Sequence, residues 1–419
     1  MNNIKQYILL IVVLLITIQA LFVVKLDLAT YIIAVCIYIL IYSIILFLKS
    51  IKFNMQSKSI QLINFYLLIG IIAIVKGFFD SVNYWEYKQV FLITGPVFLL
   101  PLVVFVGQNT IAIQLIFYNY IKFALPFSIV VYLSLSFSDN LDGLARYLSP
   151  IYFLILFYPI VNRKWKTLIF IVAIFSFFSD YGARSNMIRI LASTICMLIF
   201  YFYKFLPSII FKVIHFMLFA LPLLLFLMAT LNIFNIFKFG EYIKSDIIIE
   251  ETTSRGERVS NDFKADTRTF LYEEVIKSVY KSNNWLFGEG ASGGYSSEYF
   301  DSLGSKGRMG CEIGILNVFL YLGLIGVIIF TLIFYTASYH AIYNSNNILI
   351  KVIGLFISFR WTYSLVEEFG NFDMNYFFLW LMIGFCYSRN FQKMTDYQMK
   401  KWVIGIFEPS KSFKSKLNI

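Results

Sequence analysis

Residues 310–336 read GCEIGILNVFLYLGLIGVIIFTLIFYT, and Glu312 is the only charged residue among them. A transmembrane helix needs about 20 consecutive apolar residues, and this stretch is longer than that. It therefore predicts a helix that crosses a membrane. Similar apolar runs recur along the chain, so we expect several such helices.

The composition of the whole chain agrees with this interpretation. Of 419 residues, 59% are hydrophobic and 14% are charged, and the mean hydropathy is +0.74. Soluble domains carry about 25% charged residues, so soluble enzymes, disulfide-rich secreted proteins and disordered chains are excluded. The four cysteines show no metal-ligand spacing and are interpreted as small buried apolar residues.

The apolar runs predict an all-α polytopic membrane protein with about twelve transmembrane helices and one large outer loop. The expected segments are 7–24, 30–48, 60–76, 89–106, 111–137, 149–162, 167–179, 186–203, 209–231, 310–336, 349–366 and 374–388. The segments 149–162 and 167–179 are short and could instead form one re-entrant hairpin. The chain then divides into helices one to nine (1–231), an outer loop (232–308), helices ten to twelve (309–388) and a basic tail (389–419).

Basic residues separate the connecting loops into two sets. The loops of one set, together with the tail, contain 15 Lys and Arg residues, and the other short loops contain four. The positive-inside rule therefore places both termini in the cytoplasm and the loop 232–308 outside. The net charge of +11 does not indicate nucleic-acid binding, because the long loop has ten basic and twelve acidic residues.

Arginine is distributed differently from lysine. Only two of the 15 basic residues on the expected cytoplasmic side are Arg, and the other eight arginines lie in outer loops or near the outer ends of helices. These eight are Arg146, Arg184, Arg189, Arg255, Arg258, Arg268, Arg308 and Arg360. The planar guanidinium group binds phosphate through two hydrogen bonds, so this distribution points to a phosphate ligand. Alternatively, several of them pair with carboxylates, and Arg360 could reach Glu367.

The long outer loop contains two notable stretches. Residues 266–282 predict an amphipathic helix with Asp266 or Thr267 as its cap and a stripe of Leu271, Val275 and Val279. The glycine-rich residues 288–294 follow and could wrap a phosphate or act as a flexible lid. They lack the order of residues of a P-loop.

A catalytic metal or triad is not indicated. The chain has two histidines, His215 and His340. Both lie near the expected cytoplasmic side of the membrane and are interpreted as structural. Any general base on the outer side must then be a carboxylate. The candidates are Asp180, Asp262, Glu289, Glu298, Asp301, Glu312, Glu367 and Glu368.

Two stretches resemble the O-antigen polymerase and ligase superfamily. Residues 179–186, SDYGARSN, are similar to a small-residue, Arg-Ser element that precedes a helix in that family. Residues 285–290, WLFGEG, followed by GCEIGILN at 310–317 and GLIG at 323–326, resemble its "LFGxG … ExGIL … GxxG" run.

The resemblance implies a glycosyltransferase of the C-type membrane fold in the bacterial inner membrane. Its substrates would be undecaprenyl-diphosphate-linked oligosaccharides, which it would join at the outer face in synthesis of O-antigen or a related polysaccharide, including lipopolysaccharide. The resemblance implies no metal and no cofactor. Expected partners are membrane lipid and the chain-length regulator and flippase of the same pathway, and no nucleic acid.

The expected site follows from both lines of reasoning. Arg184, Arg308, Glu289 and Asp301 are the catalytic candidates, and Arg255, Arg258, Arg268, Arg360 and Arg189 are candidates for binding diphosphate or glycan. Family ligases use a histidine in the long loop, which this loop lacks, so polymerase is favoured. A paired Arg-x10-Gly motif of some polymerases is also missing. Three alternatives remain open: a ligase, a flippase or transporter of lipid-linked oligosaccharide, and a non-catalytic assembly partner.

Overall fold

A computed structural model defines the architecture of the chain. It describes residues 11, 13–15, 39, 40, 43, 57–136, 144, 147–178, 184–231, 233, 248–252, 258–262, 268–298, 307–367 and 370–408. The expected segments 7–24 and 30–48 and the end of the tail lie almost wholly outside the described residues.

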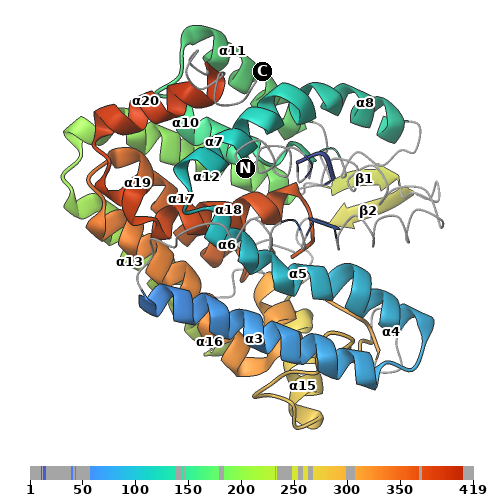
Figure 1. Ribbon diagram of the computed structural model, residues 1–419. Coiled ribbons are helices and arrows are strands. Elements are labelled where there is room, and N and C mark those ends of the chain that lie inside the picture. Colours follow the sequence, from blue (N-terminus) through green and yellow to red (C-terminus); the bar gives the residue numbers. More distant parts are fainter. Residues whose placement is uncertain are drawn as a thin grey trace.

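The described residues form a helical bundle with one small β ribbon (Figure 1). The helices of its first part are α3 (Ser57–Asp80), α4 (Tyr84–Lys88), η1 (Gln89–Thr94), α5 (Gly95–Leu99), η2 (Leu100–Leu102), α6 (Val103–Val106), α7 (Thr110–Asn119), η3 (Tyr120–Ala124) and α8 (Leu125–Ser136). Next come α10 (Ile151–Phe157), α11 (Arg163–Phe178), α12 (Arg184–Phe202), η4 (Tyr203–Phe205) and α13 (Ile209–Thr230). The rest are α15 (Thr269–Lys281), α16 (Gly314–Asn344), α17 (Ile348–Tyr363), α18 (Met374–Tyr387), α19 (Arg389–Lys393) and α20 (Asp396–Phe407).

Six helical stretches of the described chain are long and apolar enough to cross a membrane. They are Lys58–Asp80, Tyr84–Val106, Thr110–Leu133, Ser185–Phe202, Ile209–Ala229 and Gly314–Asn344. A multi-pass membrane protein is therefore supported, whereas the expected count of about twelve spans is not confirmed. The expected segment 374–388 forms the shorter apolar helix α18, and 149–162 contains only the seven-residue helix α10.

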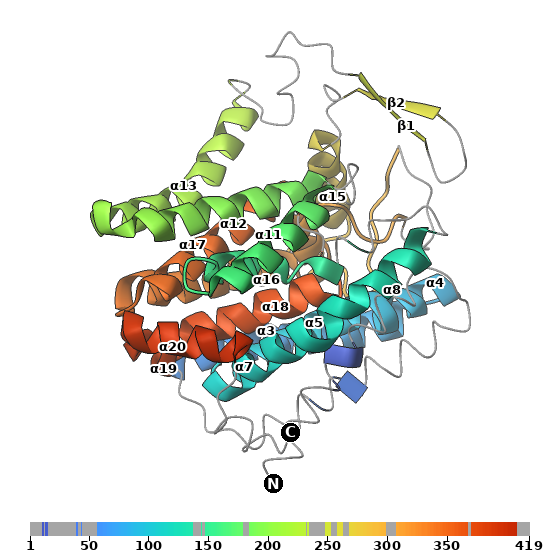
Figure 2. The same ribbon diagram turned by 90° about the horizontal axis from the view of Figure 1, so that it is seen from above.

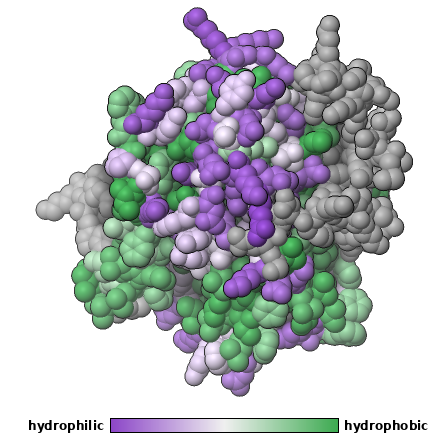
Figure 3. All heavy atoms as spheres, turned by 60° about the vertical axis from the view of Figure 1, so that its left-hand side comes forward, coloured by the Kyte–Doolittle hydropathy of each residue, from purple (hydrophilic) through white to green (hydrophobic). Residues whose placement is uncertain are grey.

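The loops on the expected cytoplasmic side gather at one end of the bundle. The hydroxyl group of Ser388 donates a 3.1 Å hydrogen bond to the carbonyl of Gln108, and the side-chain amide of Asn162 donates a 2.8 Å bond to Glu408. Figures 1 and 2 both place α19 and α20 towards the left end and α4 at the right end. We call the end with α19 and α20 the basic end. Hydrophilic residues gather on the face that this end presents in Figure 3.

Helix α16 is broken at Gly323, which has φ 67° and ψ −166°. A segment of the outer loop, residues 284–291, fills the break. The amides of Glu289 and Gly290 donate to the carbonyls of Leu320 and Tyr321, at 2.7 and 3.2 Å. Inside a membrane, irregular backbone needs such partners from the protein itself. The glycine-containing motifs WLFGEG (285–290) and GLIG (323–326) therefore contact each other directly.

Backbone amides of α16 at the break also donate hydrogen bonds to carbonyl groups of the loop. The amides of Leu324 and Ile325 donate to the carbonyls of Trp285 and Leu286, at 2.8 and 3.3 Å. A Cβ atom at Gly323 would clash with the carbonyl oxygen of Leu286, so glycine is required for this approach. The loop is thereby fixed against the membrane part.

Within the long loop, the expected helix 266–282 is present as α15. It begins at Thr269, with Arg268 at the cap position, and it buries Leu271, Val275 and Val279 as expected. The expected caps, Asp266 and Thr267, lie outside the described residues. Strands β1 (Ile248–Thr252) and β2 (Arg258–Asp262) pair antiparallel, with Ile248 opposite Asp262.

Candidate functional site

Arg268 connects the outer loop to the end of α17. Its Nε donates a 3.0 Å hydrogen bond to the carbonyl of Val366. Its two terminal nitrogens lie 3.4 Å from Oε2 of Glu312 and 3.4 Å from Oε2 of Glu367. The alternative that these arginines pair with carboxylates is therefore realised at Arg268. The Glu312 side chain is 52% exposed, so a ligand can reach this bridge from solvent.

Arg189 approaches the same place from α12. Its guanidinium carbon lies 5.7 Å from the centroid of the Tyr363 ring, a distance typical of a cation–π contact. The Tyr363 hydroxyl group donates a 3.1 Å hydrogen bond to Oε2 of Glu367, the carboxylate that pairs with Arg268. Arg189 is itself buried, with 7% of its surface exposed. Cations from α12 and from the outer loop thus meet at the end of α17.

Arg360 lies on α17, about one turn before Tyr363, and is fully buried. Its Nη2 donates a 2.9 Å hydrogen bond to the side-chain oxygen of Asn375 on α18. Glu367, the carboxylate that Arg360 was expected to reach, pairs with Arg268. We call Arg189, Arg268 and Arg360 the arginine cluster. A buried arginine within a membrane helix is costly and commonly marks a functional site.

An open groove lies next to the cluster, between α13 and α15. It has a volume of about 430 Å³ and is lined by Phe226, Thr269, Tyr272, Glu273, Ile276, Lys277 and Tyr280. It begins at the first turn of α15, directly after Arg268. Tyr272 joins the two features, because it lines the groove and its hydroxyl group donates to the carbonyl of Leu365. An apolar groove that ends at an arginine suits an amphiphilic anion.

The glycine-rich segment 288–294 is packed and buried. Besides the two amides bonded to α16, the amide of Ala291 donates to the carbonyl of Ala73 on α3 at 2.9 Å. These amides are therefore engaged and do not form a phosphate cradle. A freely moving lid is equally at odds with this packing.

Glu289 is buried in this segment, with 4% of its surface exposed. One carboxylate oxygen accepts a hydrogen bond from Ser282, and the other accepts one from Asn284 at 3.1 Å. Lys76 of α3 donates to the same Asn284 at 3.1 Å and to the carbonyl of Gly288 at 2.8 Å. These contacts indicate that Glu289 has a structural role as a brace, which holds α15, the loop and α3 together.

Arg308 lies on a short bridge beside the segment that leads into α16. Its amide donates to the carbonyl of Tyr295 at 2.8 Å, and the Tyr295 amide donates back at 2.9 Å. Burial raises the pKa of the nearby Cys311 thiol to about 12, while the positive charges of Arg308 and Arg268 act in the opposite direction.

Four expected site residues cannot be joined to the cluster. Arg184 begins α12 and Arg258 begins β2, but their side chains lie outside the described part. Arg255 and Asp301 lie outside it altogether. The neighbouring Asn186 is described: it accepts from the Tyr152 hydroxyl group and donates to the carbonyl of Ser176 at 2.5 Å. Part of the SDYGARSN stretch therefore has a structural role.

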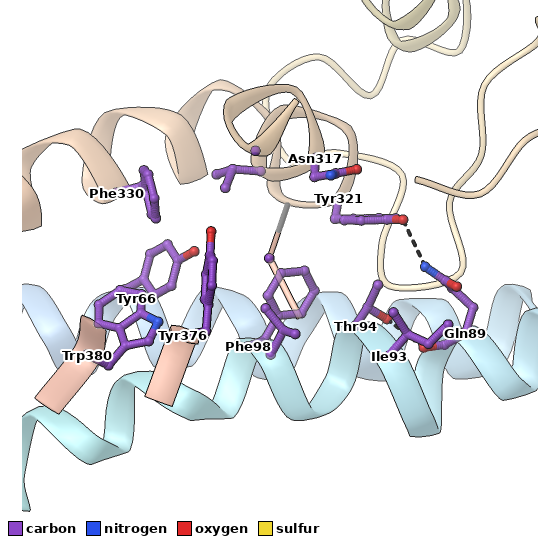
Figure 4. A pocket seen from close by; sticks show the side chains of 14 residues that line it. Tyr66, Gln89, Ile93, Thr94, Phe98, Asn317, Tyr321, Phe330, Tyr376 and Trp380 are labelled. Carbon is purple, nitrogen blue, oxygen red and sulfur yellow. Dashed lines mark hydrogen bonds between the residues drawn. The ribbon is translucent and has the colours of Figure 1, made fainter. Parts of the chain in front are cut away.

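A second cavity lies among α3, η1, α16 and α18 and is lined largely by aromatic rings (Figure 4). The amide of Gln89 donates a 2.9 Å hydrogen bond to the Tyr321 hydroxyl group at one end of it, and Tyr66 and Trp380 lie at the other. Its volume is about 50 Å³, room for a few water molecules, whereas the groove between α13 and α15 has about 430 Å³. We therefore place the candidate site at the arginine cluster.

Both histidines have structural contacts, in agreement with their interpretation. Nε2 of His215 lies 2.9 Å from the Ser338 hydroxyl group, and Nδ1 of His340 lies 2.8 Å from the Asn344 side-chain amide. Cys196, Cys311 and Cys386 are buried and free, also as expected, while Cys36 lies outside the described residues. Among the described residues, no group of three His, Cys, Asp or Glu side chains could hold a metal ion.

Two residues of the site region were not singled out from the sequence. Lys76 has a signal, because it is a single charge at the end of the apolar run 60–76. Tyr363 has none, since tyrosine is common throughout this chain. A comparison of the chain with protein-family models, curated proteins and solved structures finds no match.

Proposed function

We propose that the protein is a polymerase of oligosaccharide repeat units. It would transfer an undecaprenyl-diphosphate-linked glycan onto another lipid-linked repeat unit at the outer face of the bacterial inner membrane. The proposal combines the resemblance to O-antigen polymerases with one structural observation. This observation is the arginine cluster next to the open groove between α13 and α15.

The cluster suits a diphosphate leaving group. Breaking the bond between sugar and diphosphate builds negative charge on the phosphate, and fixed cations in a partly buried site stabilise that charge. Arg268 is 21% exposed at its side chain, and its ion pairs with Glu312 and Glu367 are both 3.4 Å long. A diphosphate has a higher charge density than either carboxylate and would take over the Arg268 fork.

The groove suits the lipid part of such a substrate. Phe226, Ile276 and Tyr280 offer apolar surface, and Ile276 and Tyr280 are 42% and 73% exposed. A polyprenyl chain in the groove would bring its diphosphate to Arg268 at the first turn of α15. The groove thus favours a lipid-linked donor over a soluble nucleotide sugar.

Complementation of a deletion strain tests the proposal. The strain should show single repeat units on their anchor and no ladder of longer chains on a gel. The wild-type protein should restore the ladder. Arg268→Ala and Arg360→Ala should fail to restore it, and Arg268→Lys should restore little, because lysine lacks the planar fork.

Arg163→Ala is the matched control, because Arg163 is an exposed arginine at the start of α11, distant from the cluster. It should restore a normal ladder at equal membrane expression. A normal ladder from well-expressed Arg268→Ala and Arg360→Ala proteins would reject the proposed role of the cluster.

A flippase of the same lipid-linked glycans is the second candidate, because the broken helix α16 is a feature that transporters use at their substrate sites. The same gel experiment separates the functions. Repeat units trapped on the cytoplasmic face of the deletion strain would indicate a flippase. Long lipid-linked chains without any anchored repeats would indicate a ligase.

A further inference from the structure

A cleft opens at the basic end of the bundle, between the end of α12 and the amphipathic helix α20. Its volume is about 380 Å³. Tyr201, Tyr203 and Lys204 form one wall, and Met399 and Lys400 of α20 form the other. The start of α17 lies at its base. The proposed catalytic chemistry lies at the other end of the bundle and leaves this cleft unexplained.

The charges of the cleft favour an anion. Lys204 and Lys400 are both exposed, and neither forms an ion pair within the part of the chain that the structure describes. Asp396 is the acidic residue among those that line the cleft, and its Oδ1 accepts a 2.8 Å hydrogen bond from the amide of Ile348. That carboxylate therefore secures the start of α17. The two lysines are left to attract a negatively charged ligand.

Additional polar groups surround the two lysines. Lys166 of α11 donates a 3.3 Å hydrogen bond to the Tyr201 hydroxyl group, and its ammonium group lies 5.7 Å from the centroid of that ring. A third cation therefore stands at the Tyr201 wall. The Tyr203 hydroxyl group can donate a hydrogen bond to a phosphate oxygen.

An exposed apolar strip on α12 leads towards the cleft. Leu191, Ile195, Leu198 and Phe202 are 52, 58, 45 and 56% exposed. Their spacing of four, three and four residues puts them on one face of the helix. Acyl chains could lie along this strip while the headgroup of the same lipid reaches Lys204, just beyond Phe202. A free phosphate ion would use the lysines but not the strip.

We propose that this cleft binds the phosphate group of an anionic phospholipid from the membrane leaflet at the basic end, between Lys204 and Lys400. Basic pockets between membrane helices are known to take such headgroups. The bound lipid would hold α20 against α12 and α17. Phosphatidylglycerol carries this chemistry and serves as the probe.

The test uses the full chain, purified into lipid nanodiscs and analysed by native mass spectrometry and thermal unfolding. Phosphatidylglycerol should remain bound to the wild-type protein and raise its Tm relative to nanodiscs of phosphatidylcholine. The double variant Lys204→Gln, Lys400→Gln should bind the lipid about 25-fold more weakly. A loss of about 5-fold per lysine corresponds to about 1 kcal/mol.

The control is the double variant Lys393→Gln, Lys401→Gln. Both lysines are exposed at the same end, do not line the cleft, and their removal changes the net charge equally. This control should bind phosphatidylglycerol as the wild type does. An equal loss in the control would show general attraction to the basic end and overturn the proposal.

Two further results would also overturn it. One is a wild-type protein whose Tm does not differ between the two lipids. The other is an equal rise in Tm from inorganic phosphate in phosphatidylcholine nanodiscs, which would assign the cleft to a free anion. The variants should elute as the wild type does in phosphatidylcholine, which checks that they are folded.

Discussion

Nη2 of Arg268 lies 3.4 Å from Oε2 of Glu367, and the backbone of the same glutamate accepts a 2.7 Å hydrogen bond from the amide of Gly314. Arg268 precedes α15, Glu367 follows α17, and Gly314 begins α16. Glu367 therefore joins the starts of α15 and α16 to the end of α17. Any ligand that displaces its carboxylate from Arg268 changes a contact between the outer loop and the membrane part.

A double-mutant cycle measures the Arg268–Glu367 pair. The variants Arg268→Ala and Glu367→Ala, and the two combined, should give a coupling energy of about 0.5–1 kcal/mol, because both side chains are partly exposed. Unfolding in detergent is the measurement. Independent effects that simply add would show that the ion pair contributes nothing to stability.

Gly323→Ala should strongly destabilise the protein. The backbone at this position has a positive φ, and the new Cβ atom would clash with the carbonyl oxygen of Leu286. Loss of the contact between loop and helix should cost more than the roughly 1–3 kcal/mol of backbone strain alone. Limited proteolysis should then cut the outer loop faster.

Leu324→Ala provides the comparison for the Gly323 variant. Leu324 is 38% exposed and keeps its backbone hydrogen bond to Trp285 whatever its side chain. It should therefore cost much less stability. Equal sensitivity of both variants to proteolysis would argue against a special role of glycine at the break.

Glu289→Gln distinguishes a brace from a general base. Glutamine keeps the shape and one acceptor oxygen. If Glu289 is a brace, the Glu289→Gln protein should therefore keep its fold and most of its activity, whereas Glu289→Ala should lower the stability. A general base contributes about 10²–10⁴-fold to the rate, and glutamine cannot supply it. Loss of the glycan ladder in a stable Glu289→Gln protein would favour the base.

Cys311 should make stability depend on pH in the alkaline range. Burial raises its pKa from 9.0 to about 12, so the folded state keeps the thiol protonated where the unfolded chain ionises. Its contribution is complete below pH 9 and is lost as the pH rises towards 12. The slope is about 1.4 kcal/mol per pH unit.

Cys311→Ser isolates this effect, because serine keeps a donor for the carbonyl of Ile313 and does not ionise. The wild type should lose unfolding free energy faster than the variant between pH 9 and 11. Parallel curves for the two proteins would show that the thiol is ionised, or free to ionise, in the folded state.

The sequence predicts the membrane class and the helical segments well, because both depend on runs of apolar residues. Helix α15 and its stripe of Leu271, Val275 and Val279 follow from periodicity alone. The number of spans is harder to predict. An apolar run such as 149–162 has the composition of a span, yet it folds as a helix of seven residues packed inside the bundle.

The candidate site could be predicted only in part. Arg189, Arg268 and Arg360 stand out as outer arginines, but they are far apart in the chain. The approach of Arg189 to Tyr363 and of Arg268 to Glu367 depends on tertiary packing. The glycine-rich segment illustrates the opposite problem. Its composition suits a phosphate-binding loop. The partners of its amides, however, lie on α3 and α16 and cannot be predicted from the local sequence.

The break in α16 has a consequence for the biogenesis of the protein. Residues 284–291 leave the ribosome before the carbonyl and amide groups of Leu320 to Ile325 exist, yet each group needs the other once α16 is in lipid. Residues 284–291 must therefore reach the backbone of α16 while this helix is being inserted into the membrane. Insertion of this helix and folding of the outer loop are therefore one event, and a truncation before Leu320 should leave a chain that quality-control proteases degrade.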